Sequence, residues 1–100
     1  MPLTSTLSED DKSLTISIAG EFGDPLMEGF RATYSEFIYS DMDFIIDFRL
    51  TEGIDSSGLG ILLTMRKLLG DSTHISIVNC RPEIKDILVY FRFDRKFDIA

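Results

Sequence analysis

Polar and apolar residues alternate early in the chain, and apolar residues later recur every three or four positions. The alternation over residues 14–18 predicts a strand with one buried face, and residues 3–7 can pair with it as a first strand. Pro25 stands where a first helical turn would begin. Apolar residues at helical spacing extend this predicted helix to about Ser40: Leu26, Met27, Phe30, Tyr34, Phe37 and Ile38.

The middle of the chain predicts a buried strand followed by a second helix. Residues 43–48 contain the apolar run Phe44-Ile45-Ile46, which is typical of a parallel central strand covered on both faces. Residues 49–55 are expected to form a loop. Ser56 then begins a helix that Gly70 closes as its C-cap.

The last third of the chain repeats this order. Residues 75–78 predict a strand entered through Ser72 and Thr73, Pro82 begins a third helix, and residues 97–99 predict a final strand. The expected order is β-β-α-β-α-β-α-β. This alternation predicts a single α/β domain over residues 1–100, with a mixed, mostly parallel β-sheet packed with α-helices.

The helix predicted over residues 56–69 carries two apolar stripes. Leu59, Leu62, Leu63 and Leu69 form one stripe, and Ile61, Met65 and Leu68 form the other. One interpretation leaves part of this wide arc exposed as a partner-binding face, with Met65 exposed. The equally weighted alternative wedges the helix between the sheet and the first helix. Arg66 and Lys67 are expected on the solvent side.

Composition narrows the possible partners and chemistry. The net charge of −7 disfavours nucleic acid, and no apolar run approaches the ~20 residues that span a bilayer, so no membrane insertion is expected. The first residues lack the pattern of a signal peptide, which predicts a cytoplasmic protein. Cys80 and His74 are each the single residue of their type, so no metal site is expected, and Cys80 is expected to be a small buried hydrophobic residue.

The segment Asp55-Ser56-Ser57-Gly58-Leu59-Gly60 places two hydroxyls at the start of the second helix. Side-chain oxygens there can cap free backbone N–H groups, and a phosphate there would meet the positive end of the helix dipole. The residues alone fit either an ordinary helix N-cap or a site at which a serine is phosphorylated for regulation. Neither serine lies in a Gly-x-Ser-x-Gly segment, and no nucleotide-binding motif is present, so the chain is not expected to be an enzyme or to need a cofactor.

The strand, the seven-residue loop and this Asp-Ser-Ser-Gly segment together resemble the STAS domain of bacterial anti-sigma-factor antagonists. The resemblance implies the STAS fold and a phosphorylated serine directly after the aspartate, which is Ser56. It also implies a partner surface that includes Asp55 and Ser57. The preceding segment Gly20-Glu21-Phe22-Gly23-Asp24 resembles the loop that joins this surface in the family, and helix-start charge explains Glu21 and Asp24 equally well. The expected partner-binding residues are Glu21, Asp24, Asp55, Ser57, Gly58, Leu59, Ile61 and Met65.

The function implied by the resemblance is partner switching. The unphosphorylated protein would bind a serine kinase or anti-sigma-type regulator, and phosphorylation of Ser56 would abolish binding. A PP2C-type serine phosphatase, or a bifunctional kinase and phosphatase, would restore it. The output could be a sigma factor, biofilm formation or motility. The alternative from the same resemblance is a non-switching STAS scaffold subunit of an ABC-type lipid transport complex.

Overall fold

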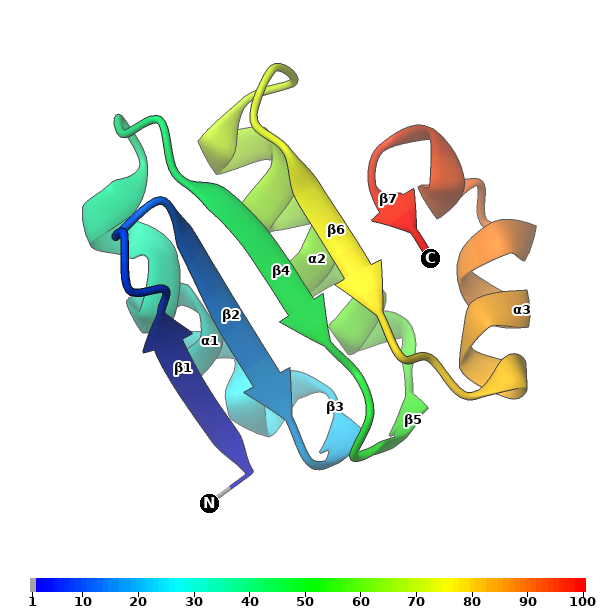
Figure 1. The fold of residues 1–100 in the computed structure, drawn as a ribbon. Coiled ribbons are helices and arrows are strands. Elements are labelled where there is room, and N and C mark those ends of the chain that lie inside the picture. Colours follow the sequence, from blue (N-terminus) through cyan, green and yellow to red (C-terminus); the bar gives the residue numbers. More distant parts are fainter. Residues whose placement is uncertain (1) are drawn as a thin grey trace.

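A five-stranded sheet forms the centre of the molecule (Figure 1). The structure is a computed structural model that describes residues 2–100. The strand order in the sheet is β1-β2-β4-β6-β7. The five strands are β1 (Leu3–Leu7), β2 (Ser13–Ile18), β4 (Asp43–Asp47), β6 (Ile75–Val78) and β7 (Asp98–Ile99). Strand β1 pairs antiparallel with β2, and all other neighbours in the sheet are parallel, so the predicted mixed, mostly parallel sheet is confirmed.

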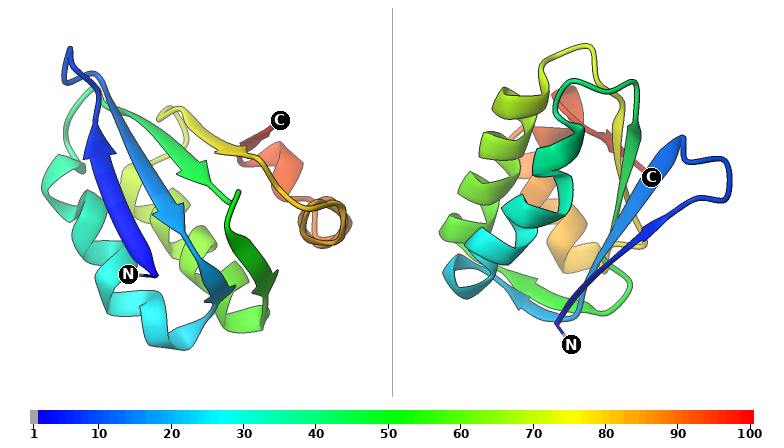
Figure 2. Two further views of the ribbon diagram at one scale, coloured as in Figure 1. Left: turned by 60° about the horizontal axis from the view of Figure 1, so that its bottom comes forward. Right: turned by 90° about the vertical axis from the view of Figure 1, so that its left-hand side faces the viewer.

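Three α-helices connect these strands: α1 (Met27–Tyr34), α2 (Ser56–Leu69) and α3 (Pro82–Tyr90). Helices α1 and α2 cover one face of the sheet, and α3 lies beside its β7 edge (Figures 1 and 2). The first helix is shorter than expected, because 3-10 turns flank it at Asp24–Leu26 and Ser35–Phe37. The ends of α2 agree with the prediction, and Gly70 follows it at a φ of 90°, a conformation that favours glycine.

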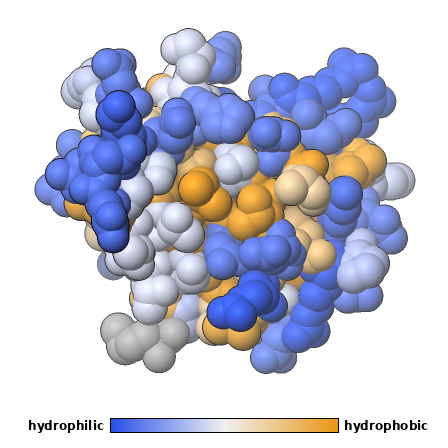
Figure 3. All heavy atoms as spheres, viewed as in Figure 1, coloured by the Kyte–Doolittle hydropathy of each residue, from blue (hydrophilic) through white to orange (hydrophobic). Residues whose placement is uncertain are grey.

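The core lies between the sheet and the helices. Alternate residues of the strands, including Ile16, Phe44 and Ile46, are fully buried against Phe30 of α1 and Leu62 of α2. Among residues 2–100 no helix covers the opposite face of the sheet, and Figure 3 shows this face as largely hydrophilic with a hydrophobic area near the middle. The expectation that the central strand is covered on both faces was therefore wrong. Ile45, which points to the helix-free face, is only half-buried.

The segment expected to be a loop contains a strand. Strand β5 (Thr51–Ile54) pairs in parallel with β3 (Gly20–Phe22), and together they form a second, two-stranded sheet. The hydroxyl of buried Thr51 donates a hydrogen bond of 2.6 Å to the carbonyl of Ile18. Pairing between segments thirty residues apart produces these strands, since three or four residues containing glycine carry no strand pattern of their own.

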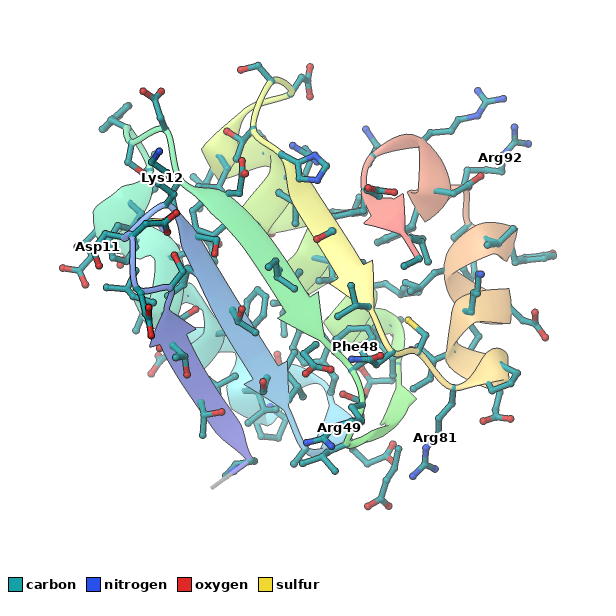
Figure 4. All side chains as sticks on the ribbon, viewed as in Figure 1. Asp11, Lys12, Phe48, Arg49, Arg81 and Arg92 are labelled. Carbon is teal, nitrogen blue, oxygen red and sulfur yellow. The ribbon has the colours of Figure 1, made fainter. Side chains whose placement is uncertain are left out.

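Asp47 holds the entry to β5. Its carboxylate accepts hydrogen bonds from the Arg49 N–H at 2.9 Å and from the Asn79 side-chain amide at 3.0 Å. The Arg81 side chain, by contrast, points away from the sheet (Figure 4). Asp47 therefore joins the ends of β4 and β6 and positions the chain that leads to the second helix.

The burial of Arg66 differs from what the sequence predicted. Its side chain was expected in solvent, but the residue is only 8% exposed. The guanidinium donates hydrogen bonds to the carbonyls of Gly70 (2.8 Å), Thr73 (2.7 Å) and Lys96, and it lies 5.2 Å from the centre of the Phe97 ring. Burial lowers the pKa of Arg66, and nearby Asp71 opposes that effect. Arg66 thus fastens the C-terminal segment to α2, whereas Lys67 is exposed as expected.

Cys80 follows β6 and is half-buried against the core, and burial raises the pKa of its thiol. Within residues 2–100, no group of three or more histidine, cysteine, aspartate or glutamate side chains could hold a metal ion. No helix in the same part of the chain is both long and apolar enough to cross a bilayer.

Candidate functional site

The start of helix α2 is organised by Asp55. Its backbone is extended (φ −109°, ψ −174°), and its carboxylate accepts the N–H of Gly58 at 2.9 Å. The Asp55 carbonyl also accepts the first helical hydrogen bond, from the N–H of Leu59 at 3.1 Å. Asp55 is therefore the N-cap of the helix. Neither Ser56 nor Ser57 supplies this cap, so their hydroxyls are not committed to holding the helix start.

Gly58 allows α2 to approach the small sheet closely. A Cβ atom at this position would collide with the carbonyl oxygen of Phe22 and would lie 2.7 Å from Cγ1 of Ile54. Gly23 lies equally close to the cap, because a Cβ there would be 2.7 Å from an Asp55 carboxylate oxygen. Two glycines thus permit β3, β5 and α2 to meet, and this contact fixes where the two serines lie.

The two serines differ in their surroundings. Ser56 is the first residue of α2 and is exposed, whereas Ser57 is half-buried. Ser57 lines a hollow of about 310 Å³ between α1 and α2, whose other lining residues are Asp24, Met27, Arg31, Tyr34, Gly60, Ile61 and Thr64. An enzyme that transfers a phosphoryl group to a serine needs access from solvent, and Ser56 offers more of it.

The surface around Ser56 is acidic. Glu21 of β3, Glu52 of β5, the N-cap Asp55 and Asp24, which begins the 3-10 turn after β3, are all exposed. The Glu21 carboxylate lies over Gly53, where a Cβ atom would be 2.6 Å from its nearest oxygen. The structure therefore brings Asp55 to the same side of the molecule as Glu21 and Asp24, which lie much earlier in the sequence. A partner that covers this side must present neutral or basic groups.

Three of the expected partner-binding residues are buried. Met65 is fully buried and Ile61 is 6% exposed, so the prediction of an exposed Met65 was wrong. Both side chains pack in the core, as in the alternative in which the helix is wedged between the sheet and the first helix. Gly58 is buried as well, and Leu59 is partly buried.

The exposed face of α2 follows a different helical phase. Its exposed residues, at positions i, i+4, i+7, i+8 and i+11, are Ser56, Gly60, Leu63, Thr64 and Lys67. Leu63, which the apolar pattern groups with Leu59, Leu62 and Leu69, is 41% exposed, whereas Leu62 of the same stripe is fully buried. Because residues three or four positions apart share one side of a helix, the positions that follow Ser56 at this spacing identify the exposed face from the sequence. It joins Ser56 and an exposed leucine on one continuous surface.

Comparison with known proteins agrees with this architecture. A family model described as "Mlab, STAS domain" matches residues 5–99. The STAS-domain containing protein PA14_20770 of Pseudomonas aeruginosa (strain UCBPP-PA14) is 35% identical over 101 residues, which cover all of both chains.

Solved structures show the same fold at lower identity. A putative anti-sigma factor antagonist from Thermotoga maritima has a TM-score of 0.80 at 18% identity, covering 97% of this chain and 84% of that one. The Bacillus cell fate determinant SpoIIAA in its phosphorylated form has a TM-score of 0.73 at 22% identity, covering 98% and 90%. With a family model matched over nearly its whole length, an α/β fold like that of SpoIIAA and a full-length relative, this chain belongs to the STAS domain family.

Proposed function

We propose that this protein is a phosphorylation-controlled binding protein of a partner-switching pathway, with Ser56 as the phosphorylated residue. The observation that carries the proposal is the exposed Ser56 at the first position of α2, beside an N-cap that Asp55 supplies without it. A modified Ser56 would leave the helix start intact. The fold would then tolerate the modification while the surface changes.

The charge change explains how such a switch would act. A phosphoryl group adds about −1.5 to −2 charges and three strong acceptors. The helix dipole offsets only about half a charge near the first turn. With Asp55 adjacent and Glu21, Asp24 and Glu52 exposed nearby, a docked partner would have to desolvate this concentrated negative charge. The unphosphorylated form is therefore the binding-competent one.

The proposed partners are a serine kinase or anti-sigma-type regulator with a histidine-kinase-like ATPase domain, and a PP2C-type serine phosphatase or a bifunctional kinase and phosphatase. The similarity to SpoIIAA, which has been solved in a phosphorylated form, supports a kinase among the partners. The acidic surface around Ser56 fits a basic docking face on the regulator. We place the protein in the cytoplasm, where such regulators act.

One experiment tests the proposal in the native cell. The tagged protein, its Ser56→Ala variant and its Ser57→Ala variant are purified from cells in which the gene is expressed, and their intact masses and phosphopeptides are measured. We expect one phosphate on the wild type and on Ser57→Ala, and none on Ser56→Ala. Phosphate mapped to Ser57, or modification of Ser56→Ala at the wild-type level, would overturn the assignment.

Partner identification in the same preparations separates the two candidate functions. Ser56→Ala should retain the regulator, whereas Ser56→Asp should lose it to the extent that one carboxylate imitates a phosphate. The absence of phosphate together with co-purified ABC permease and ATPase subunits would instead establish the scaffold role. In that case the surface around Ser56 is a permanent contact with the ATPase.

A further inference from the structure

Strand β1 forms an open edge of the main sheet. It lies outermost, pairs only with β2, and faces the viewer uncovered in the right-hand view of Figure 2. Its residues are exposed except for the half-buried Leu3. The opposite edge, β7, has only two residues and includes the charged Asp98. Natural proteins usually guard a long edge with charge, a bulge or a cover, and β1 has none of these along its five residues.

The hydrogen bonds of the hairpin define which backbone groups of β1 face outward. The Ala19 N–H donates to the Pro2 carbonyl at 2.8 Å, and the Ser8 N–H donates to the Ser13 carbonyl at 2.9 Å. In an antiparallel pair the hydrogen-bonded positions alternate, so Thr4 and Thr6 also bond to β2. The N–H and C=O groups of Leu3, Ser5 and Leu7 therefore point away from the sheet.

The sequence of β1 is Leu-Thr-Ser-Thr-Leu, which reads identically in both directions. A twofold axis through Ser5 would pair two copies antiparallel, with Ser5 opposite Ser5 and Leu3 opposite Leu7. These are the positions whose backbone groups point outward, so every outward N–H and C=O from Leu3 to Leu7 would find a partner. The direction of the backbone groups and the symmetry of the sequence thus select the same register.

The side chains suit the same pairing. Leu7 is 43% exposed beside a hollow of about 250 Å³, which is also lined by Leu14 and Phe37, and Leu3 of the second copy would cover it. On the helix-free face Thr4 would stand opposite Thr6, a favourable cross-strand pair. Apolar surface would be buried on one face and hydroxyls matched on the other.

Charge favours this edge over other surfaces for self-association. The chain has a net charge of −7, and its β1 strand is uncharged. In the register centred on Ser5, residue 8 of one copy lies opposite residue 2 of the other. The acidic hairpin residues Glu9, Asp10 and Asp11 of the two copies would therefore lie at opposite ends of the paired strands, far from each other.

We propose that β1 binds a second copy of this chain, by antiparallel pairing of the two strands about Ser5 into one continuous sheet. The pairing uses a different part of the molecule from the start of α2. A homodimer would thus present two Ser56 surfaces.

Sedimentation over a concentration series tests the pairing. The wild type should pass from the mass of one chain to twice that mass as concentration rises. Ser5→Pro removes an outward N–H without removing a bond to β2, so it should remain a monomer with an unchanged circular dichroism spectrum. The matched variant Ser5→Ala keeps the N–H and should dimerise like the wild type. A monomeric wild type, or a dimeric Ser5→Pro, would overturn the proposal.

Disulfide trapping tests the register independently. In a Cys80→Ala background, Ser5→Cys would bring two Cα atoms to about 5.5 Å, within the range that a disulfide spans. The control Thr4→Cys would place its two cysteines two residues apart along the strands, beyond the roughly 7 Å limit. Oxidised Ser5→Cys should migrate as a covalent dimer on a non-reducing gel and Thr4→Cys as a monomer. Equal cross-linking of both, or none with Ser5→Cys, contradicts the register.

Discussion

The carboxylate of Asp55 accepts the backbone N–H of Gly58 at 2.9 Å, which makes Asp55 the N-cap of helix α2 and leaves Ser56 as its exposed first residue. Asp55 therefore stabilises the helix start, and the neighbouring Ser56 is the residue proposed to be phosphorylated. A phosphate on Ser56 would lie near the positive end of the helix dipole without displacing the Asp55 cap, so the helix start would stay in place. The separation lets the surface charge change while the fold persists.

Substituting the two neighbours should therefore have unequal effects on stability. Asp55→Ala removes the capping acceptor and should lower the free energy of unfolding by about 0.5–2 kcal/mol. Ser56→Ala removes no capping bond and should change it by no more than about 0.5 kcal/mol. Chemical denaturation of both variants measures the difference. A larger loss for Ser56→Ala than for Asp55→Ala would mean that the serine holds the helix start.

Two glycines of α2 offer a matched pair of alanine substitutions. At Gly58 an added Cβ meets the Phe22 carbonyl oxygen, so Gly58→Ala should push the helix from the small sheet and destabilise the protein by more than about 1 kcal/mol. At Gly60 nothing lies within 4 Å of the added Cβ, and Gly60→Ala should stabilise the helix by up to about 1 kcal/mol. Thermal melts of the two variants should shift in opposite directions.

The exposed face of α2 can be tested apart from the core. Leu63→Asp changes a residue that is 41% exposed, so the domain should stay folded while binding to the regulator weakens. Met65→Asp places a carboxylate in the fully buried core and should unfold the domain. Leu62→Ala provides the scale, since its loss from the core should cost about 2–5 kcal/mol. Circular dichroism and pull-down of the regulator distinguish the two effects, and wild-type binding by folded Leu63→Asp would remove Leu63 from the interface.

Arg66 should behave as a structural residue despite its charge. Its guanidinium donates to three backbone carbonyls, so Arg66→Met leaves those acceptors without their donor and should cost at least about 2 kcal/mol of unfolding free energy. Arg66→Lys keeps the charge but lacks the planar fork and should restore little of that loss. Denaturation of both variants measures the effect. Full recovery in Arg66→Lys would show that charge alone matters there.

The sequence alone predicted the elements in which side-chain periodicity reports local structure. The alternation over residues 14–18, the apolar run at 44–46 and the Pro82 helix start agree with β2, β4 and α3. The Asp-Ser-Ser-Gly segment predicted the helix start at Ser56. These features depend only on residues that are close in the sequence, so each can be recognised within a short segment.

Tertiary structure decided what depends on distant segments. Strands β3 and β5 form because they pair with each other across thirty residues, and Arg66 is buried because the C-terminal segment returns to cover it. Met65 and Leu63 are both apolar residues of one helix, and only the packing of α2 into the core determines that Met65 is buried and Leu63 exposed. Periodicity identifies an apolar arc, but the elements packed against the arc select which part of it remains in water, because burial is a property of the whole fold.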